Sequence, residues 1–248
     1  MRTAAILLSF ICAPLTAQIG IGLSPMRVEM KIGPGQSYSG ALELTNETGG
    51  RMRIRGEILD FTLDKTMTPQ FARSMEQESP WSCRQWLTVN PMETEIGDRE
   101  KLIIRYTIRV PRDAPQRGYH CAAGFTAMAP AGAPKAIGIR NIVRAVAAFY
   151  ATTGDHHPKG EVSGLSIEKA GNSNIAVLVV RNDADVHIRP SGRLEVLDAA
   201  GQPVETLDVP SFPVLPKPEQ RFVLPLASDP AMAPALRVPV DLGLGPPN

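Results

Sequence analysis

The stretch that decides the fold is residues 136–150, AIGIRNIVRAVAAFY. Its odd positions are apolar except for one asparagine, and they run from Ile137 through Val143 to Phe149. Alternation with a period of two is typical of a long β-strand with one buried face. The even positions change along the run from small or charged to apolar. We therefore expect the second half to be covered on both faces and the first half to lie at the edge of a sheet.

A strand at a sheet edge carries backbone N–H and C=O groups that have no partner in their own sheet. Another chain can pair with these groups and thereby extend the sheet. The run is therefore a candidate partner-binding strand, with Ile137, Ile139 and Val143 on the face that would contact the partner. The alternative is an ordinary last strand of a β-domain, in which these three side chains belong to the core.

The rest of the sequence indicates an all-β protein. A chain of 248 residues is long enough for one large domain or two of ordinary size. Its 23 prolines recur between short β-prone runs, which is typical of strands joined by many turns. About seven such runs precede residue 152, and a second set follows a polar linker. The predicted fold class is all-β, with two immunoglobulin-like β-sandwich domains in tandem over residues 18–152 and 153–248.

Residues 1–17, MRTAAILLSFICAPLTA, have the features of a cleaved signal peptide. Arg2 gives the positive start, an apolar core follows, and Thr16 and Ala17 are small residues suited to a cleavage site. No later run is long and apolar enough to span a bilayer, so no transmembrane segment is expected in the mature chain. The predicted location is periplasmic or secreted. The net charge of +1 gives no basic surface for nucleic acid.

Two cysteines, Cys83 and Cys121, remain once the signal is removed. In an exported protein, two cysteines most simply form one disulfide. Such a bridge would stabilise the fold by about 3–4 kcal/mol, because it restricts the unfolded chain. The alternative is a pair of buried free thiols.

Residues 64–85 interrupt the strand pattern. The preceding run changes phase near Leu59 and Asp60, which indicates a β-bulge. The segment itself lacks alternation and is long for a connection. We therefore expect it to be either functional or partly helical around residues 71–77.

Residue patterns that carry catalysis or bind metals are not evident in the sequence. Asp155, His156 and His157 are adjacent, but a solvated turn is favoured over a metal site because no matching ligand pair lies nearby. His120 and His187 stand alone in the sequence. No nucleophile elbow, phosphate-binding loop or zinc-protease motif is present. The sequence therefore predicts a non-enzymatic protein with no catalytic residues, no metal site and no cofactor.

Four short stretches carry a resemblance to a known family. They are LSPMRV at residues 23–28, GALELTN at residues 40–46, VNP at residues 89–91 and AAFY at residues 147–150. In this order they resemble strands of the periplasmic pilus-assembly chaperones, over most of residues 20–152. The resemblance implies two immunoglobulin-like domains at an angle, and a function in binding pilus subunits by lending them a strand. The second domain agrees with the family only in its fold class.

The resemblance also implies a partner site. Arg27 matches a basic residue in the family's opening strand, which implies that it holds the terminal carboxylate of a partner. The family's second basic residue falls on Ala147, so the anchor is incomplete, and a lysine restored there is expected to strengthen it. A solvated charge on a strand face is the alternative for Arg27. The implied partner is a pilin-like or surface-protein subunit, with an usher as a further partner.

The sequence is therefore consistent with two functions. The first is a non-enzymatic, periplasmic chaperone-like protein that binds pilus or surface-protein subunits by strand donation from residues 136–150. The long segment at residues 64–85 and the missing basic residue depart from the family pattern. The alternative is consequently a cell-envelope module that binds the surface or peptidoglycan, or has a structural role, without a chaperone cycle.

Overall fold

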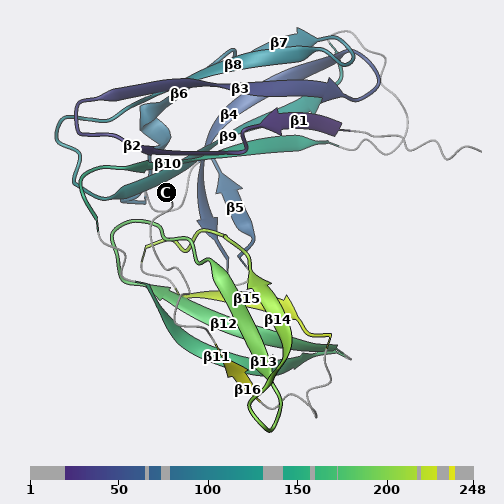
Figure 1. Ribbon diagram of the computed structural model, residues 1–248. Coiled ribbons are helices and arrows are strands. Elements are labelled where there is room, and N and C mark those ends of the chain that lie inside the picture. The colour runs from purple at the N-terminus through teal and green to yellow at the C-terminus, as the bar shows by residue number, and fades with distance from the viewer. Residues whose placement is uncertain are drawn as a thin grey trace, which may run out of the picture.

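The computed structural model describes residues 20–64, 67–73, 79–130, 142–156, 160–171, 173–216, 219–227 and 235–237. Within these ranges the regular secondary structure is β-strand, apart from the 3-10 turn η1(Arg84–Trp86). The strands form two β-sandwiches, one after the other along the chain (Figure 1). The predicted fold class, all-β with two immunoglobulin-like sandwiches in tandem, is confirmed. The predicted signal peptide, Ile137 and Ile139 lie outside the described residues.

The first sandwich consists of two sheets. One sheet has the order β1(Gly20–Ser24), β3(Ser37–Glu47), β8(Lys101–Arg109), β6(Leu87–Asn90). The other has the order β2(Arg27–Lys31), β10(Arg144–Thr152), β9(Gly118–Met128), β4(Met52–Leu63), and both β5(Pro69–Ala72) and β7(Glu93–Ile96) pair with β4. Strands β1 and β2 follow each other directly but belong to different sheets. Strand β2 runs parallel to β10, whereas β1 runs antiparallel to β3.

The alternating runs of the sequence produce the core between these sheets. On β8 the alternate residues Ile104, Tyr106 and Ile108 are buried, and the residues between them are more exposed. The Tyr106 ring meets the Phe149 ring of β10 edge-on, with ring centres 4.9 Å apart. The other face of β10 is also covered, because Val146 and Ala148 pack against an apolar cluster outside this core. The prediction that the second half of the 136–150 run is covered on both faces is thus confirmed.

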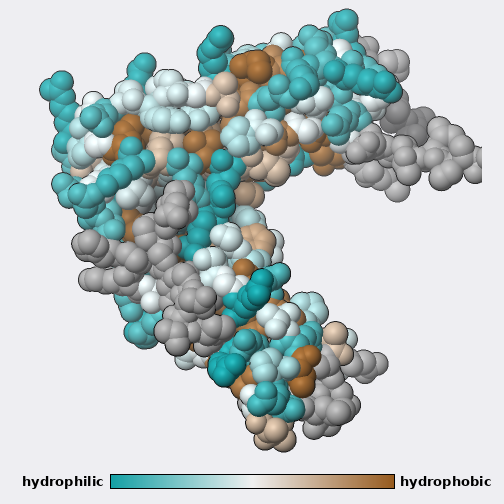
Figure 2. Space-filling model, viewed as in Figure 1, coloured by the Kyte–Doolittle hydropathy of each residue, from teal (hydrophilic) through white to brown (hydrophobic). Residues whose placement is uncertain are grey.

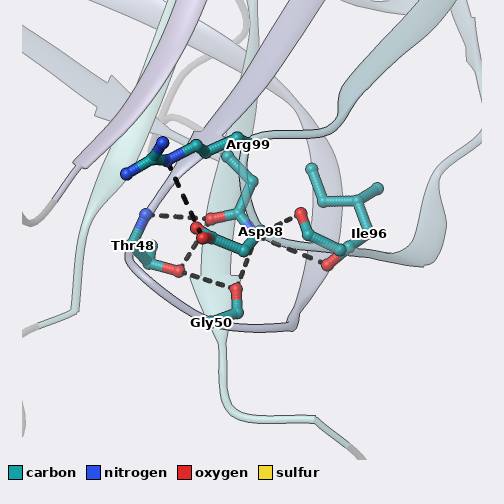
Figure 3. Close-up of polar contacts among 7 residues, drawn as sticks. Thr48, Gly50, Ile96, Asp98 and Arg99 are labelled. Carbon is teal, nitrogen blue, oxygen red and sulfur yellow. Dashed lines mark hydrogen bonds and ion pairs between the residues drawn. The ribbon is translucent and has the colours of Figure 1, made fainter.

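A buried asparagine connects two turns of this sandwich. Asn46, near the end of β3, donates hydrogen bonds from Nδ2 to the carbonyl oxygens of Gly50 and Gly97, each at 2.7 Å. Its Oδ1 accepts a hydrogen bond from the backbone N–H of Thr48 at 3.0 Å. Figure 3 shows Thr48 and Gly50 of the first turn together with Ile96, the last residue of β7, and with Asp98 and Arg99 of the second turn. The side chain therefore ties the turn after β3 to the turn after β7.

Strand β4 leaves its sheet part of the way along. Its pairing with β9 ends at Leu59↔Ala122, and its last residues pair with β5, starting at Asp60↔Ala72. The phase change near Leu59 and Asp60 is this departure from β9, where a β-bulge was expected. The expected helix is wrong at residues 71 and 72, which lie in β5, because the backbone there pairs with β4. Residues 74–78 lie outside the described residues.

The place that β4 vacates beside β9 is filled by residues 81–83. His120 donates its backbone N–H to the carbonyl oxygen of Trp81 at 2.8 Å, and the N–H of Cys83 donates to the carbonyl oxygen of His120 at 3.2 Å. A disulfide joins Cys83 to Cys121, whose Cα atoms are 5.2 Å apart. The predicted disulfide is confirmed, and it attaches the end of the 64–85 segment to β9.

The second sandwich is smaller. One sheet has the order β11(Gly160–Ala170), β12(Ser173–Asn182), β15(Glu219–Pro225), and the other has the order β14(Pro203–Val209), β13(Gly192–Leu197), β16(Ala235–Arg237). Its buried core includes Leu178, Ile188, Leu194 and Phe222. A third apolar cluster draws on both sandwiches, since Leu59, Phe61, Ala122 and Tyr150 pack with Leu215. Among the described residues, no helix has the length and apolar character needed to cross a membrane.

Candidate partner-binding site

Strand β10 has an open edge at its start. On one side it pairs with β9 over its whole length, from Arg144↔Thr126 onward. On the other side it pairs with β2 only from Ala148↔Arg27 onward. The N–H of Ala127 also donates to the carbonyl oxygen of Val143 at 2.9 Å, so β9 holds the chain just before β10 begins. Within the described part of the chain, residues 144–147 therefore have a strand neighbour on one side alone.

The side chains around this edge divide into two faces. Ala145, Ala147 and Phe149 point into the core, and Val143 on the same face is half-buried. Ile142 belongs to the opposite face and is 73% exposed. The predictions from sequence missed Ile142, because only the odd positions were assigned to a partner. The sequence feature that could have indicated it is an apolar isoleucine at an even position, two residues after the charged Arg140.

Arg27 lies beside β10 at the beginning of β2. Its side chain is 55% exposed, and its Nε is 3.4 Å from Oε1 of Glu29. Ala147, the position of the family's second basic residue, has 0% exposure and belongs to the core of the first sandwich. This burial argues against the expectation that a lysine at 147 would strengthen an anchor, because its ammonium group would enter the core.

A buried polar cluster lies behind Arg27, where the two sandwiches meet. Arg189 of the second sandwich donates from Nε to Oε1 of Glu29 at 2.6 Å, and its side chain is 6% exposed. Its guanidinium carbon is 4.9 Å from the centre of the Tyr150 ring. His187 Nε2 is 3.5 Å from Oε2 of Glu29. Glu29 is thus the acidic centre of a joint between the domains, and it partly neutralises Arg27 as well.

The environment of this joint changes the protonation of its residues. Burial would raise the pKa of Glu29, but His187 and Arg189 outweigh it and hold that pKa below the ordinary value. Burial lowers the pKa of His187. Burial, followed by the neighbouring His187, lowers the pKa of His120 to about 4. Burial also raises the pKa of Tyr150 to about 12. At neutral pH the joint therefore contains neutral histidines and an ionised Glu29.

The interpretation that the two histidines stand alone is wrong. His187 contacts the Tyr150 ring in a tilted arrangement with ring centres 4.4 Å apart, and the centre of the His120 ring lies 4.9 Å from that of Phe61. Both rings lie at the joint and influence each other electrostatically. Local sequence carried no signal for this contact, because the residues come from different sandwiches.

A recess of about 310 Å³ lies in front of the joint. Glu29, Tyr150, His187 and His156 are among its lining residues, and an ion pair between Lys31 and Asp155 lies beside them.

In the described ranges, no group of three or more His, Cys, Asp or Glu side chains is arranged to hold a metal ion. On the face shown in Figure 2, both sandwiches have a largely hydrophilic surface that is interrupted by smaller hydrophobic areas.

No protein-family model matches the chain, and no curated protein matches it. Solved structures do match. A chain of a chaperone–tip adhesin complex of CFA/I fimbriae has 12% identity and a TM-score of 0.48, with 82% of this chain and 84% of that chain covered. The YadV chaperone has 14% identity and a TM-score of 0.47, with 87% and 89% covered. A chain of the Salmonella enterica SafA pilin–SafB chaperone complex has 16% identity and a TM-score of 0.46, with 84% and 85% covered. The similarity to these proteins concerns the fold.

Proposed function

We propose that the protein is a non-enzymatic, chaperone-like binding protein of the cell envelope that holds a protein subunit by lending it the strand at residues 136–150. The observation that carries this proposal is the open edge of β10 at residues 144–147. A strand of another chain can continue the sheet at such an edge through backbone hydrogen bonds. The exposed Ile142 lies directly before this edge and offers apolar surface to the same partner.

Side chains on the lent strand would supply the selectivity. Ile137, Ile139 and Val143 alternate along the run, so an extended backbone presents them on one face. Burial of an exposed isoleucine in a groove of the partner contributes roughly 1.5–3 kcal/mol, before the cost of ordering both chains. Val143 contributes less than the isoleucines, because it is already half-buried in the free protein.

Arg27 would bind the terminal carboxylate of the partner. Its side chain is 55% exposed, and its backbone pairs with Ala148, where β2 begins to pair with β10. A partner strand laid along the open edge would therefore end close to this charge. A single exposed ion pair is weak, on the order of 1 kcal/mol or less, so Arg27 orients the partner more than it holds it.

The partner class in this proposal is a pilin-like or surface-protein subunit, with an usher as a further partner. The protein would act in the periplasm, or after secretion, following cleavage near Ala17. The test places a photo-crosslinking amino acid at position 142, and as a control at Val223, which is 46% exposed on the second sandwich. We expect illumination in the native periplasm to give a subunit adduct from position 142 and none from the control.

A double change, Ile137→Asp with Ile139→Asp, then tests the lent strand. The adduct from position 142 should disappear while the melting temperature stays unchanged, because both side chains would be free until a partner binds. A collapse of the melting temperature would show instead that these isoleucines belong to the core. A peptidoglycan fragment in place of a protein adduct would favour the envelope-binding module.

A further inference from the structure

The segment that interrupts the strand pattern builds a hairpin that reaches the second sandwich. Beyond Leu59, the strand partner of β4 among the described residues is β5, from Asp60↔Ala72 to Leu63↔Pro69. In Figure 1 this hairpin projects from the first sandwich toward the second. It therefore adds nothing to the sheet it leaves, and its apolar side chains need another surface to cover them.

The hairpin meets the second sandwich at its base and at its tip. At its base, the Phe61 ring lies 5.6 Å from that of Phe71 and 5.8 Å from that of Tyr150. Leu215 of the second sandwich joins this cluster. At the tip, Met67 packs against the core cluster of the second sandwich. The hairpin thus has apolar contacts with the second sandwich at two separate points.

The backbone at the tip gives an independent reason to assign a role to Met67. Its φ is +64°, in the left-handed region that suits glycine and disfavours a long side chain. The strain at such a position is retained only where the surroundings require that residue. Because the turn itself would accept glycine, the contact of the methionine side chain with the second core explains why methionine is present.

The base of the hairpin is fixed to the end of the same segment. Asp60 is 7% exposed, and its carboxylate accepts hydrogen bonds from Ser82 Oγ and from Arg84 Nε, the latter at 3.1 Å. Between these two residues, Cys83 is bonded to Cys121 of β9. The hairpin therefore stands on a cross-linked base and cannot swing freely.

We infer that the hairpin formed by residues 60–64 and 67–72 is a strut that holds the two sandwiches at one fixed angle. Its base is anchored to β9, and its tip is seated on the core of the second sandwich. This role does not depend on the proposed partner, because it is a property of the free chain. It assigns a mechanical purpose to the 64–85 segment.

The test compares Met67→Gly with Arg99→Gly. Arg99 has a similar backbone conformation, with φ of 57°, but lies in an exposed turn of the first sandwich. Both changes relieve backbone strain, and only the first removes a contact with the second sandwich. Spin labels attached to cysteines introduced by Arg109→Cys and Val223→Cys report the distance between the sandwiches, measured by double electron–electron resonance. We expect one narrow distance distribution in the parent and in Arg99→Gly, and a broad one in Met67→Gly.

An equally narrow distribution in Met67→Gly would overturn the strut. Because the hairpin could fail to form in that variant, a second measurement uses NMR relaxation of the backbone amide nitrogens in the full chain, which gives the rotational correlation time of each sandwich. Met67→Ala keeps the Cβ atom and removes the rest of the contact. Separate correlation times for the two sandwiches in this variant would support the strut, and a single shared value would contradict it.

Discussion

Acidification is expected to destabilise the joint between the two sandwiches, because His120 is buried there in its neutral form. Burial and the neighbouring His187 lower the pKa of His120 from 6.5 to about 4. The unfolded chain binds a proton at this imidazole below pH 6.5, whereas the folded chain binds it only near pH 4. The unfolded state therefore holds more protons in this window, and the free energy of unfolding decreases as the pH falls.

The size of this effect follows from the shift. A change from 6.5 to about 4 corresponds to about 3 kcal/mol, which is fully lost only near pH 4. His187, whose pKa is also lowered, adds to the loss in the same direction. Glu29 acts in a lower window: its depressed pKa stabilises the fold above 4.5, and this contribution is lost as the pH falls through the depressed value.

Urea unfolding between pH 7.5 and 4 measures this directly, with the fluorescence of Trp81 and Trp86 as the signal. His120→Gln removes one titrating group but keeps a hydrogen-bond donor, so the pH slope should fall by about 1.4 kcal/mol per pH unit. A parent whose stability is flat from pH 6.5 to 4, or a His120→Gln variant with an unchanged slope, would refute the reasoning.

Three further changes test other parts of the structure. Replacement of both Cys83 and Cys121 by alanine should cost about 2–4 kcal/mol in urea unfolding, because the unfolded chain gains freedom; no loss would contradict a structural bridge. Gly118→Ala should destabilise the fold by about 1–3 kcal/mol in the same assay, since its new Cβ would lie 2.8 Å from Cα of Val186 across the joint. An unchanged free energy of unfolding would show that the backbone at the joint shifts to accommodate the methyl group. Ala147→Lys should cost about 3 kcal/mol or more, because position 147 is fully buried; normal melting would show that the lysine escapes the core.

Periodicity in the sequence was sufficient to predict the strands and the sandwich class. The alternation in residues 136–150 predicted which side chains of β10 face the core, because burial of one face requires it. The disulfide was predicted from the expected export and from the number of cysteines, since only Cys83 and Cys121 lie outside the predicted signal peptide. These features depend on local pattern or on simple pairing, and both are visible in one sequence.

The joint and the hairpin could not be predicted in the same way. Glu29 and Arg189 meet because two sandwiches dock, and no local pattern encodes that contact. Residues 69–72 read PQFA, which has a proline and no alternation, so their pairing with β4 depends on tertiary context. Ile142 was missed for a related reason. Its 73% exposure depends on how the chain just before β10 packs, which alternation in the sequence does not reveal.

The short segment beside β9 has a consequence for the order in which the protein matures. Before the two sulfurs are joined, residues 81–83 are held to β9 by the two backbone hydrogen bonds at His120. If these hydrogen bonds opened, the uncovered edge of β9 could pair with a strand of another molecule. Formation of the disulfide keeps residues 81–83 on β9, so this edge of β9 stays covered, and the edge at the start of β10 is unchanged. Thiol chemistry therefore limits which sheet edges a newly made chain offers to its neighbours.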